Sequence, residues 1–532
     1  MHRYTRIVCW SSICITALGM LALASPVSLT PQSFEPAWGL VRPLQVRADA
    51  ASRSVATAAI RYGQMSRAER RAAIDAQWGP GLSTAEKLQI FDTFWQYVDE
   101  RFAAFQGIDV NWRALRDHYR PEVAAGVSRG RFAGIINHMS LALGESHTQP
   151  ADLLVNFDTL PVPGVPLLTV AAWTVDTSGT CSTALDDGSA LVYSAVPGHP
   201  LGLEAGDRVL GYNGRPWRDL YRELLDEELP LWILWWGSSP SSFDHTFVMA
   251  ATSNWHLFDT MDVAKKNGAI VHMSTSLMPG PVFHGFCSAQ MRIPGVPKPA
   301  PFRGSVSWGI VDQTRIGYIY VWNWRDPLGA AFEQAVLDLT QNQQVDGLII
   351  DYRFNTGGFL KAPRPGIGAL LGHPTATIGF DLRRDPSDHF RMRLLDQPSL
   401  YKLDFDPDSN KRIKAVFDKR VAVLVGPGAL SAGDFSSLWM ADYGKVRIFG
   451  KPTSAAFNLP TQPYLGTGTE IPLHPDWFAR VAEANAFEVG SPHQYLTHQE
   501  FRVDERVWLT PQDVAAGRDT VVEAALRWLT AP

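Results

Sequence analysis

The stretch GLIIDYRFNTGG, residues 347–358, decides the class of fold. It is a continuous apolar run that ends in a pair of glycines. A short run of this kind is typical of a strand that is buried on both faces inside a parallel sheet. Glycines at the end of such a strand let the backbone bend sharply and turn its N–H groups into a cleft. The stretch therefore predicts an α/β sheet whose edge carries either an oxyanion-binding turn or an ordinary tight turn.

A second stretch, GALSAGDFSSLWMADYGKVRIFG at residues 428–450, follows another predicted strand at 421–425. It places Ser431 where the next helix begins, in the positive field of a helix N-terminus. The hydroxyl of Ser431 is thus a candidate nucleophile, and the N–H of Ala432 is placed to face the same oxygen. A serine at this position is also a common helix cap, so the sequence leaves both roles open.

Residues 304–532 have the pattern of an α/β core. Apolar strands are predicted at 316–324, 348–351, 421–425 and 446–449, with helical runs between them. Strands that alternate with helices imply crossover units and a largely parallel sheet. A predicted stiff linker at 294–303, which contains PGVPKPAP, precedes this core.

Residues 83–158 are predicted to form a helical domain. The run STAE at 83–86 has the spacing of a capping box, and apolar residues follow it at helical intervals. A second periodic run ends at Gly144, a natural helix stop, and leads into the loop 144–148. For residues 25–82 the sequence supports no firm assignment.

Residues 159–293 change to short predicted strands separated by turns. The run LVYSAVPGHPLGLEAGDRVLGYNGRPW at 191–217 contains the pair Asn213-Gly214, a strong hairpin signal. Its succession of strands, turns and small apolar residues resembles a PDZ domain with insertions, a module that binds extended chain ends by adding a strand to its sheet. An ordinary β-rich insert with similar turns is the alternative.

The first 24 residues have the pattern of a secretory signal peptide. Two early arginines precede an apolar run, which ends at the small-x-small site 22–24. An uncleaved membrane anchor is the alternative, because the apolar run is nearly long enough to span a bilayer. The signal peptide predicts a periplasmic or secreted protein without stable membrane insertion after cleavage. Two cysteines lie outside it, Cys181 and Cys287, and they either pair in an oxidising compartment or stay as free thiols.

Composition narrows the classes of partner. Hydrophobic residues make up 45% and charged residues 19% of the 532 residues, which fits a globular protein with a sizeable core. The formal net charge of −5 gives no reason to expect a nucleic-acid partner. His493, His498 and Glu500 could be drawn as a metal cluster, but their spacing matches no strong metal signature. We therefore expect no metal and no cofactor.

A nucleophilic serine needs a base. His147 is the candidate by residue type, because it lies in a loop after a predicted helix and directly follows Ser146. No Gly-x-Ser-x-Gly elbow is present, which argues against an α/β-hydrolase. A lone histidine in a loop is also commonly a surface or capping residue.

The motifs in chain order resemble the tail-specific, or C-terminal-processing, serine peptidases. Ser146-His147 precedes the PDZ-like region, the strand 351–358 reads Asp-x-Arg-x-Asn-x-Gly-Gly, and residues 431–434 read Ser-Ala-Gly-Asp. The resemblance covers about residues 85–532 and implies an α/β, crotonase/ClpP-like core with parallel strands that carries out acyl-enzyme chemistry. In the common branch of this family a lysine activates the serine. The matching position here is Ala456, while the nearby lysines are out of register.

The other branch resembles the tricorn core protease, in which a Ser-His pair before the PDZ-like region serves a distant serine. A late glutamate completes the site of that branch. The segment that should carry this glutamate matches the family poorly in this sequence, where Glu500 is the nearest candidate and Glu488 a weaker one. The site residues that the resemblance implies are Ser431 (nucleophile), His147 (general base), Ser146 (orienting the imidazole), Gly358 and Ala432 (oxyanion N–H groups) and Glu500 (late glutamate).

The sequence thus predicts a secreted or periplasmic serine endopeptidase that cleaves peptides or proteins through an acyl-enzyme, with C-termini as candidate cleavage regions. A non-catalytic protein on the same scaffold, binding a ligand or a peptide, is the alternative, because retinoid-binding relatives carry apolar ligands on this fold. A scaffold that acts only through the PDZ-like region leaves Ser431 and His147 without a role. The sequence indicates no oligomeric state.

Overall fold

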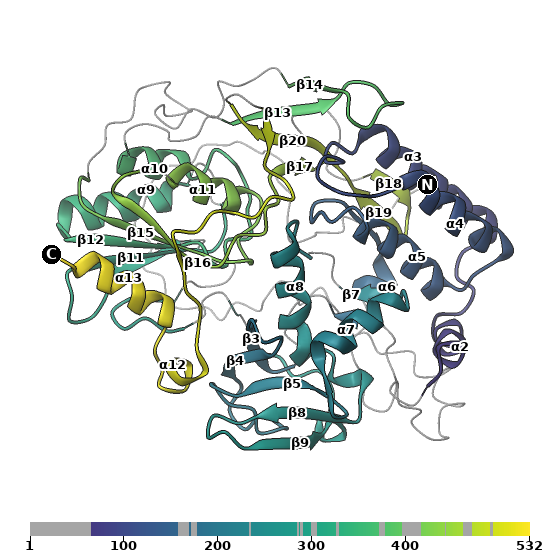
Figure 1. Ribbon diagram of the computed structural model, residues 1–532, viewed down its shortest axis with the longest axis horizontal. Coiled ribbons are helices and arrows are strands. Elements are labelled where there is room, and N and C mark those ends of the chain that lie inside the picture. Colours follow the sequence, from purple (N-terminus) through teal and green to yellow (C-terminus); the bar gives the residue numbers. More distant parts are fainter. Residues whose placement is uncertain are drawn as a thin grey trace, which may run out of the picture. The chain divides into compact units, whose positions relative to one another are not determined.

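Every residue described below belongs to one compact unit, Ala59–Pro532. The predicted signal peptide lies outside the described residues. Among the described residues, no helix is both long and apolar enough to cross a membrane. The computed structural model (Figure 1) describes residues 65–157, 170–171, 178–232, 236–284, 287, 291–298, 306–325, 329–371, 378–395, 417–441, 443–460, 471–489 and 493–532.

The α/β core contains a six-stranded sheet in the order β10-β11-β12-β15-β16-β22. Strands β11 to β22 of this order pair in parallel, and only β10 is antiparallel to its neighbour. The predicted largely parallel sheet is therefore confirmed, and four of its strands fall on the predicted segments. The strands are β10 (Val306–Ile310), β11 (Ile316–Val321), β12 (Gly347–Asp351), β15 (Val421–Val425), β16 (Val446–Gly450) and β22 (Glu505–Arg506).

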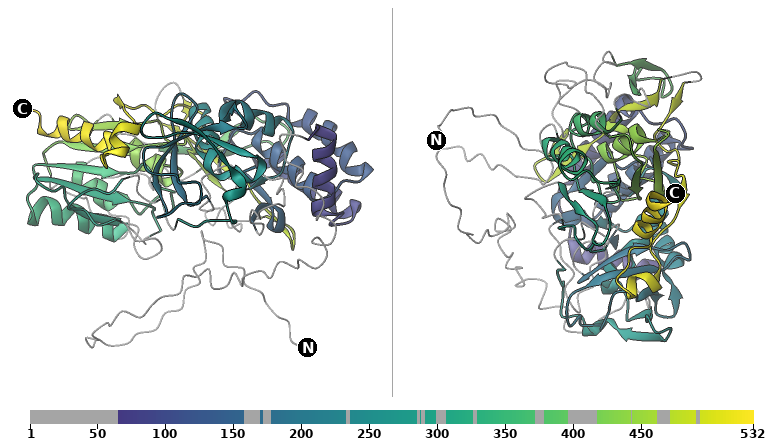
Figure 2. Two further views of the ribbon diagram at one scale, coloured as in Figure 1. Left: turned by 90° about the horizontal axis from the view of Figure 1, so that it is seen from below. Right: turned by 90° about the vertical axis from the view of Figure 1, so that its left-hand side faces the viewer.

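Helices cover both faces of this sheet (Figures 1 and 2). Side chains alternate between the two faces of a strand, and the core follows that alternation. Leu348 and Ile350 of β12 pack with helices α9 and α11, whereas Ile349, between them, packs with helix α13. The covering helices are α9 (Ala330–Leu337), α10 (Arg364–Leu371), α11 (Ala432–Met440) and α13 (Thr520–Thr530).

The N-terminal helical region is completed by strands from the far end of the chain. The predicted capping box is present at Ser83 and Glu86, where helix α3 begins. Strand β1 (Gln149–Asp152) follows the helices and pairs with β19 (Trp477–Arg480), which pairs with β18 (Ile471–His474). The sequence did not predict this long-range sheet. The helices are α2 (Arg67–Trp78), α3 (Thr84–Arg101), α4 (Trp112–Ala125) and α5 (Arg129–Leu141).

A further sheet connects the helical region to the α/β core. Its order is β14-β13-β20-β17, and β21 pairs with β20. Strand β20 begins two residues after β19 ends, so one continuous segment joins the sheet that contains β1 to the sheet that contains β17. The strands are β13 (Ile378–Arg383), β14 (Met392–Leu394), β17 (Asn458–Pro460), β20 (Ala482–Glu488) and β21 (Gln494–Tyr495).

The β-rich region contains the sheet β3-β4-β5-β8-β9, with β6 paired to β5. The predicted hairpin turn is confirmed, since Asn213 (φ 51°) and Gly214 (φ 75°) join β5 to β6 with the positive φ values of a type I′ turn. Cys181 and Cys287 form a disulfide with a Cα–Cα distance of 5.6 Å. The elements are β3 (Thr180–Ala184), β4 (Ala190–Ala195), β5 (Arg208–Tyr212), β6 (Arg215–Pro216), β8 (Thr260–Ala264), β9 (Ile270–Ser274), α7 (Trp217–Asp226) and α8 (Pro240–Met249).

The described part of the predicted linker packs against the core. Val296 is buried in the same cluster as Ile316 and Tyr318, so this segment covers the sheet as well as joining two regions. The remaining short elements are α6 (Leu153–Phe157), α12 (Pro511–Ala515), β2 (Val170–Ala171), β7 (Leu231–Trp232), the 3₁₀ helices η3 (Ala250–Ser253), η4 (Trp255–Leu257) and η5 (Thr275–Leu277), and the π-helical turn η7 (Asp338–Asn342).

Candidate active site

Ser431 lies between β15 and α11, at the N-cap position of the helix. Its hydroxyl makes no capping hydrogen bond to the helix. The backbone φ of Ser431 is +57°, a conformation that costs a non-glycine residue on the order of 1–3 kcal/mol and that is concentrated at functional sites. Of the two roles that the sequence left open, the capping role is absent, and the partly exposed hydroxyl is available.

The turn after β12 packs directly against Ser431, so the two stretches singled out in the sequence meet. The Leu430 N–H donates to the Asn355 carbonyl at 3.0 Å. Gly357 has a φ of +78°, and a Cβ atom added to it would lie 2.7 Å from the Cβ of Ser431. Only glycine allows this close approach, which explains the first glycine of the pair.

Two backbone N–H groups are candidates for an oxyanion hole. Ala432 is the first residue of α11, and the N–H groups of a first turn have no partner within the helix. Gly358 (φ +139°) forms an isolated bridge with Trp324. By contrast, the Gly357 N–H donates to the Asn355 side-chain oxygen at 3.0 Å and is occupied. Of the expected pair, Ala432 directly follows Ser431, and Gly358 directly follows Gly357, the glycine that packs against Ser431.

His147 lies two residues before β1, and its ring is held by two residues that the sequence did not single out. Its Nδ1 atom is hydrogen-bonded to Oδ1 of Asn458, the first residue of β17. Oε1 of Glu145, a fully buried carboxylate, lies 3.6 Å from the same Nδ1 atom. If Nδ1 carries the proton that Asn458 accepts, Nε2 has a free lone pair and can act as a base.

Glu145 also fixes the backbone of this loop. Its carboxylate accepts the N–H groups of His147 and Thr148, both at 2.7 Å. The Thr148 hydroxyl in turn accepts the N–H of Ala482, at the start of β20, at 3.1 Å. A signal for Glu145 was present in the sequence, because a carboxylate two residues before a loop histidine can reach both the ring and the loop backbone. Asn458 carried only a weak signal, a polar amide in a strand.

Ser146 does not orient the imidazole as the resemblance implied. Its N–H donates to the Ser238 hydroxyl at 3.0 Å, and its own hydroxyl accepts from the same Ser238 hydroxyl at 3.3 Å. Ser238 donates its N–H to the Ser454 carbonyl at 2.8 Å, and Ser454 donates its N–H to the Ala429 carbonyl at 2.8 Å. This chain of bonds brings the loop of His147 to a point two residues before Ser431. The side chains of His147 and Ser431 are both described, and no hydrogen bond joins them.

The late glutamate also differs from expectation. Glu500 accepts the N–H of Ser241 at 3.0 Å and its hydroxyl at 2.5 Å, so it binds the first turn of α8 and not His147. Glu488 is exposed at the end of β20. The structure therefore corrects the assignment of Glu500 as the late glutamate of the site. Among the described residues, Asn458 is hydrogen-bonded to the His147 ring and Glu145 lies beside it.

The two lysines that lie near the expected position in the sequence, Lys445 and Lys451, are bound elsewhere among the described residues. Lys445 Nζ donates to the Leu370 carbonyl at 2.8 Å, and Lys451 Nζ pairs with Asp186 at 2.8 Å. Ala456 fills the position at which the lysine branch carries its base, and it is fully buried.

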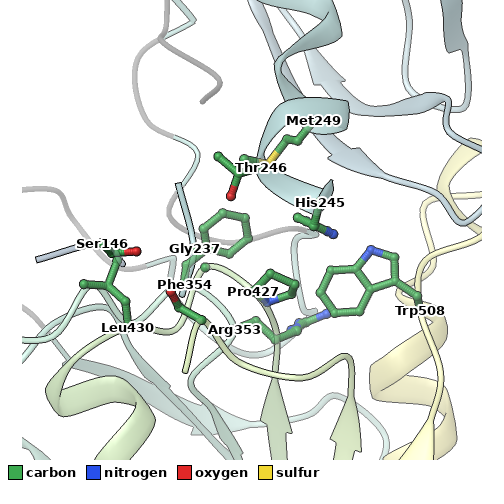
Figure 3. A pocket seen from close by; sticks show the side chains of 12 residues that line it. Ser146, Gly237, His245, Thr246, Met249, Arg353, Phe354, Pro427, Leu430 and Trp508 are labelled. Carbon is green, nitrogen blue, oxygen red and sulfur yellow. The ribbon is translucent and has the colours of Figure 1, made fainter. Parts of the chain in front are cut away.

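A narrow pocket adjoins this site (Figure 3). Ser146, Leu430 and Ser454 line it beside the segments that carry His147 and Ser431, and its free volume of about 20 Å³ holds roughly one water molecule. Its other side comes from α8, where the Nδ1 atom of His245 has no partner among the described residues. Burial lowers the pKa of His245 well below its ordinary value, so this imidazole is neutral. The remaining lining residues include Phe354, Met249, Pro427 and Trp508.

Two family-level sequence models match the chain. The model of peptidase family S41 matches residues 315–476, and the model of the tricorn protease C1 domain matches residues 83–140. The first range contains Ser431 and Asn458, whereas His147 lies outside both. No curated protein sequence matches the chain significantly.

Solved structures with a similar fold include mature CPAF complexed with lactacystin, which is 11% identical with a TM-score of 0.57 and covers 84% of this chain and 98% of that chain. Mature CPAF without this compound is also 11% identical, with a TM-score of 0.56 and coverage of 84% and 96%. The photosystem II D1 C-terminal processing protease is 17% identical, with a TM-score of 0.40 and coverage of 81% and 95%. The likeness to CPAF is one of fold.

An α/β core of this kind, a strained and uncapped serine, and the two family matches define a serine peptidase, a hydrolase of peptides or proteins. Residues 315–476 are similar to peptidase family S41, and the helical region is similar to the tricorn C1 domain.

Proposed function

We propose that this protein is a periplasmic or secreted endopeptidase in which Ser431 is the nucleophile and His147 the general base. The observation that carries the proposal is the pairing of an uncapped serine at φ +57° with a histidine whose Nδ1 atom is bound by Asn458. Together these features leave free the two atoms that the chemistry needs, Ser431 Oγ and His147 Nε2.

The mechanism is acyl transfer. His147 Nε2 takes the proton of Ser431 as Oγ attacks the scissile carbonyl, and it returns the proton to the leaving amine. The N–H groups of Gly358 and Ala432 stabilise the oxyanion, and losing one such donor costs about 3–4 kcal/mol in the barrier. Water then releases the acyl group. Binding of substrate closes the remaining gap between His147 and Ser431, because catalytic hydrogen bonds often tighten only in the complex.

We assign the site to the Ser-His type of this family and not to the Ser-Lys type. Support comes from the occupied ammonium groups of Lys445 and Lys451 and from the apolar side chain of Ala456. The sheet around β12 and β15 is then a crotonase/ClpP-like core, and the β-rich region is a PDZ-like module that receives an extended chain end. The edge strand β9 of that region is a candidate place for strand addition.

Export is supported by two features. The first 24 residues have the pattern of a signal peptide. Cys181 and Cys287 are paired, and disulfides persist mainly in oxidising compartments such as the periplasm and the extracellular space. Substrates would therefore be proteins or peptides outside the cytoplasm.

A fluorophosphonate probe tests the proposal on the purified mature protein. We expect labelling of the wild type and no labelling of Ser431→Ala or His147→Ala. Ser437→Ala is the matched control, because Ser437 is a buried serine of α11 whose hydroxyl donates to the Gly433 carbonyl at 3.0 Å. Labelling that persists in Ser431→Ala would show that another serine is the nucleophile.

One observation favours the alternative function, a non-catalytic binding protein. His147 and Ser431 are not hydrogen-bonded in this structure, and the adjoining pocket has room for about one water molecule. If the folded wild type is not labelled even after addition of peptide substrates, the binding function is the better explanation.

A further inference from the structure

Asp434 lies one turn into α11 and is completely buried. Its carboxylate accepts the N–H of Ser431, and it also accepts the N–H groups of Ala455 at 2.9 Å and Ala456 at 3.2 Å. A single side chain therefore joins the serine turn to the turn at 453–456, on a different part of the chain.

Ser431 and Asp434 have the spacing of a capping box, in which the N-cap hydroxyl and the N3 carboxylate each bind a backbone N–H. Three other helices in the described chain make a serine-based box in full, α2, α3 and α8. Helix α11 makes only half of it. The Asp434 carboxylate takes the Ser431 N–H, but the Ser431 hydroxyl binds no N–H of the helix.

Two of the residues whose N–H groups Asp434 accepts have strained backbones. Ser431 has φ +57° and Ala455 has φ +59°. Alanine has no polar side chain that could stabilise a left-handed conformation, which costs an L-residue roughly 1–2 kcal/mol. Strained residues persist only where their surroundings fix them. The N–H groups of both strained residues point to the same carboxylate.

We propose that Asp434 is a positioning residue that keeps the Ser431 hydroxyl free for attack by holding the Ser431 and Ala455 backbones in their strained conformations. This inference rests on the proposed function of Ser431. When the carboxylate is lost, the Ser431 turn can relax to an ordinary N-cap, and the hydroxyl then binds a helix N–H and is no longer available.

The same carboxylate links the serine to the β-rich region. The Ser454 carbonyl, within the turn that Asp434 holds, accepts the N–H of Ser238 at 2.8 Å and the hydroxyl of Ser242 in α8 at 3.1 Å. A movement of α8 therefore reaches Asp434 through the turn 453–456. Asp434 is placed to relay that movement to Ser431.

We expect the ionisation of Asp434 to control the reactivity of Ser431. Burial raises the pKa of Asp434 to about 7, against the opposing effect of hydrogen bonds from the Thr453 side chain and from the backbone N–H groups that it accepts. Its hydrogen-bond partners on α11 and on the turn 453–456 are the Thr453 side chain and the backbone N–H groups of Ser431, Ala455 and Ala456, all of them uncharged. A protonated Asp434 accepts these N–H groups more weakly, and the serine should lose reactivity below neutral pH.

The test uses the full-length mature protein, with Asp434→Asn as the variant and Glu86→Gln as the matched control. Glu86 is the carboxylate of the complete capping box of α3. Rates of fluorophosphonate labelling are measured from pH 4.5 to 9. We expect Asp434→Asn to be labelled about 10- to 100-fold more slowly than the wild type at pH 8, since a hydrogen bond to a charged group is worth that factor. Glu86→Gln should be labelled at the wild-type rate.

The slope of the acid limb of the pH–rate profile distinguishes a positioning role of Asp434 from a merely structural one. For the wild type, the logarithm of the rate should fall more steeply with decreasing pH than for Asp434→Asn, because Asp434 takes up an additional proton. Asp434→Asn should fall with a slope of one. Should the variant fail to fold, a wild-type slope of one by itself overturns the proposal, and equal rates and slopes in a folded variant also overturn it.

Hydrogen exchange provides a readout that does not depend on catalysis. The amides of Ser431, Ala455 and Ala456 should all be less protected in Asp434→Asn than in the wild type at pH 8, after correction for intrinsic rates, because the carboxylate that accepts them is gone. Unchanged protection overturns the proposal. Coupled loss of protection in Asp434→Asn, together with a wild type that is never labelled, would support the role of Asp434 while refuting the function proposed for Ser431.

Discussion

Nδ1 of His147 is hydrogen-bonded to Oδ1 of Asn458, although the two residues are 311 positions apart in the chain. The contact depends on two sheets. Strand β1, just after His147, pairs with β19, and β20, just after β19, pairs with β17, whose first residue is Asn458. The histidine of the helical region is thereby fixed against the α/β core.

Replacing Asn458 should weaken catalysis by releasing the imidazole. We expect Asn458→Ala to lower kcat by about 10- to 100-fold with little change in KM, because a largely buried ring nitrogen loses its partner at a cost of roughly 1–3 kcal/mol. Asn458→Asp should shift the acid limb of the pH–rate profile to higher pH, since a nearby negative charge stabilises the imidazolium. Steady-state kinetics on a peptide substrate measure both effects.

Asn485 provides the control for that experiment. It is the cross-strand partner of Asn458 and equally buried, but its side-chain oxygen accepts the Thr497 hydroxyl at 2.7 Å and does not contact His147. Asn485→Ala should lower stability without changing the pH profile. If Asn458→Ala and Asn485→Ala changed kcat equally, this would contradict a specific role of Asn458 in holding the imidazole.

Gly357→Ala should reduce both folding stability and serine reactivity. The added Cβ would meet Ser431 Cβ at 2.7 Å and the Leu430 carbonyl oxygen at 2.8 Å, and φ +78° is itself unfavourable for alanine. We expect a loss of about 1–3 kcal/mol in the free energy of unfolding and slower labelling of Ser431. Gly268→Ala separates the two causes, because Gly268 has φ +89° with nothing within 4 Å of an added Cβ. It should lose stability and keep normal labelling.

The sequence predicted the core well because the core depends on local patterns. Continuous apolar runs identified β12 and β15, and the glycine pair and Ser431 follow them directly. The sheet that contains β1 could not be predicted, since Trp477 and its neighbours pair with a strand more than 300 residues earlier. For the same reason the sequence found His147 but not Asn458. Ser146 and Glu500 were assigned by resemblance, and their hydrogen bonds go to Ser238 and Ser241 instead.

Arg353, Asp351 and Asp519 form a buried charge cluster next to the active-site turn. We expect substitutions in this cluster to differ in their effect on the free energy of unfolding. Arg353 is almost fully buried and pairs with Asp351 at 2.7 Å and with Asp519 at 2.9 Å. Arg353→Met leaves two buried carboxylates without a cation, and we expect a loss of about 3–5 kcal/mol in the free energy of unfolding. Urea denaturation at pH 7 measures this loss.

Asp519→Asn should cost far less at the same cluster. Asp519 is the N-cap of α13, and asparagine caps a helix about as well as aspartate. Burial raises the pKa of Asp519, so its ionised form is disfavoured in the fold, and removing that charge leaves Arg353 balanced by Asp351 alone. We expect a change of less than about 1 kcal/mol. A loss as large as that of Arg353→Met would contradict this account of the cluster.

Reduction of the disulfide should destabilise the β-rich region. Cys181 and Cys287 are separated by 106 residues, and a crosslink that closes a loop of this length contributes about 2–5 kcal/mol to stability. Cys181→Ser with Cys287→Ser, or treatment with a dithiol, should lower the free energy of unfolding by that amount. Thiol titration of the unfolded wild type should detect no free thiol among these two residues before reduction.

Asp434 should give the stability of the protein a recognisable dependence on pH. Its pKa is raised to about 7 in the fold, whereas an aspartate in the unfolded chain titrates near 4. The unfolded state therefore loses its proton first, so this group's contribution to stability is fully present below pH 4 and is lost as the pH rises to about 7. The difference in unfolding free energy between wild type and Asp434→Asn should fall by a few kcal/mol over this interval and stay constant above it. A flat difference from pH 4 to pH 8 would mean that Asp434 is ionised throughout, and that its three N–H partners outweigh its burial.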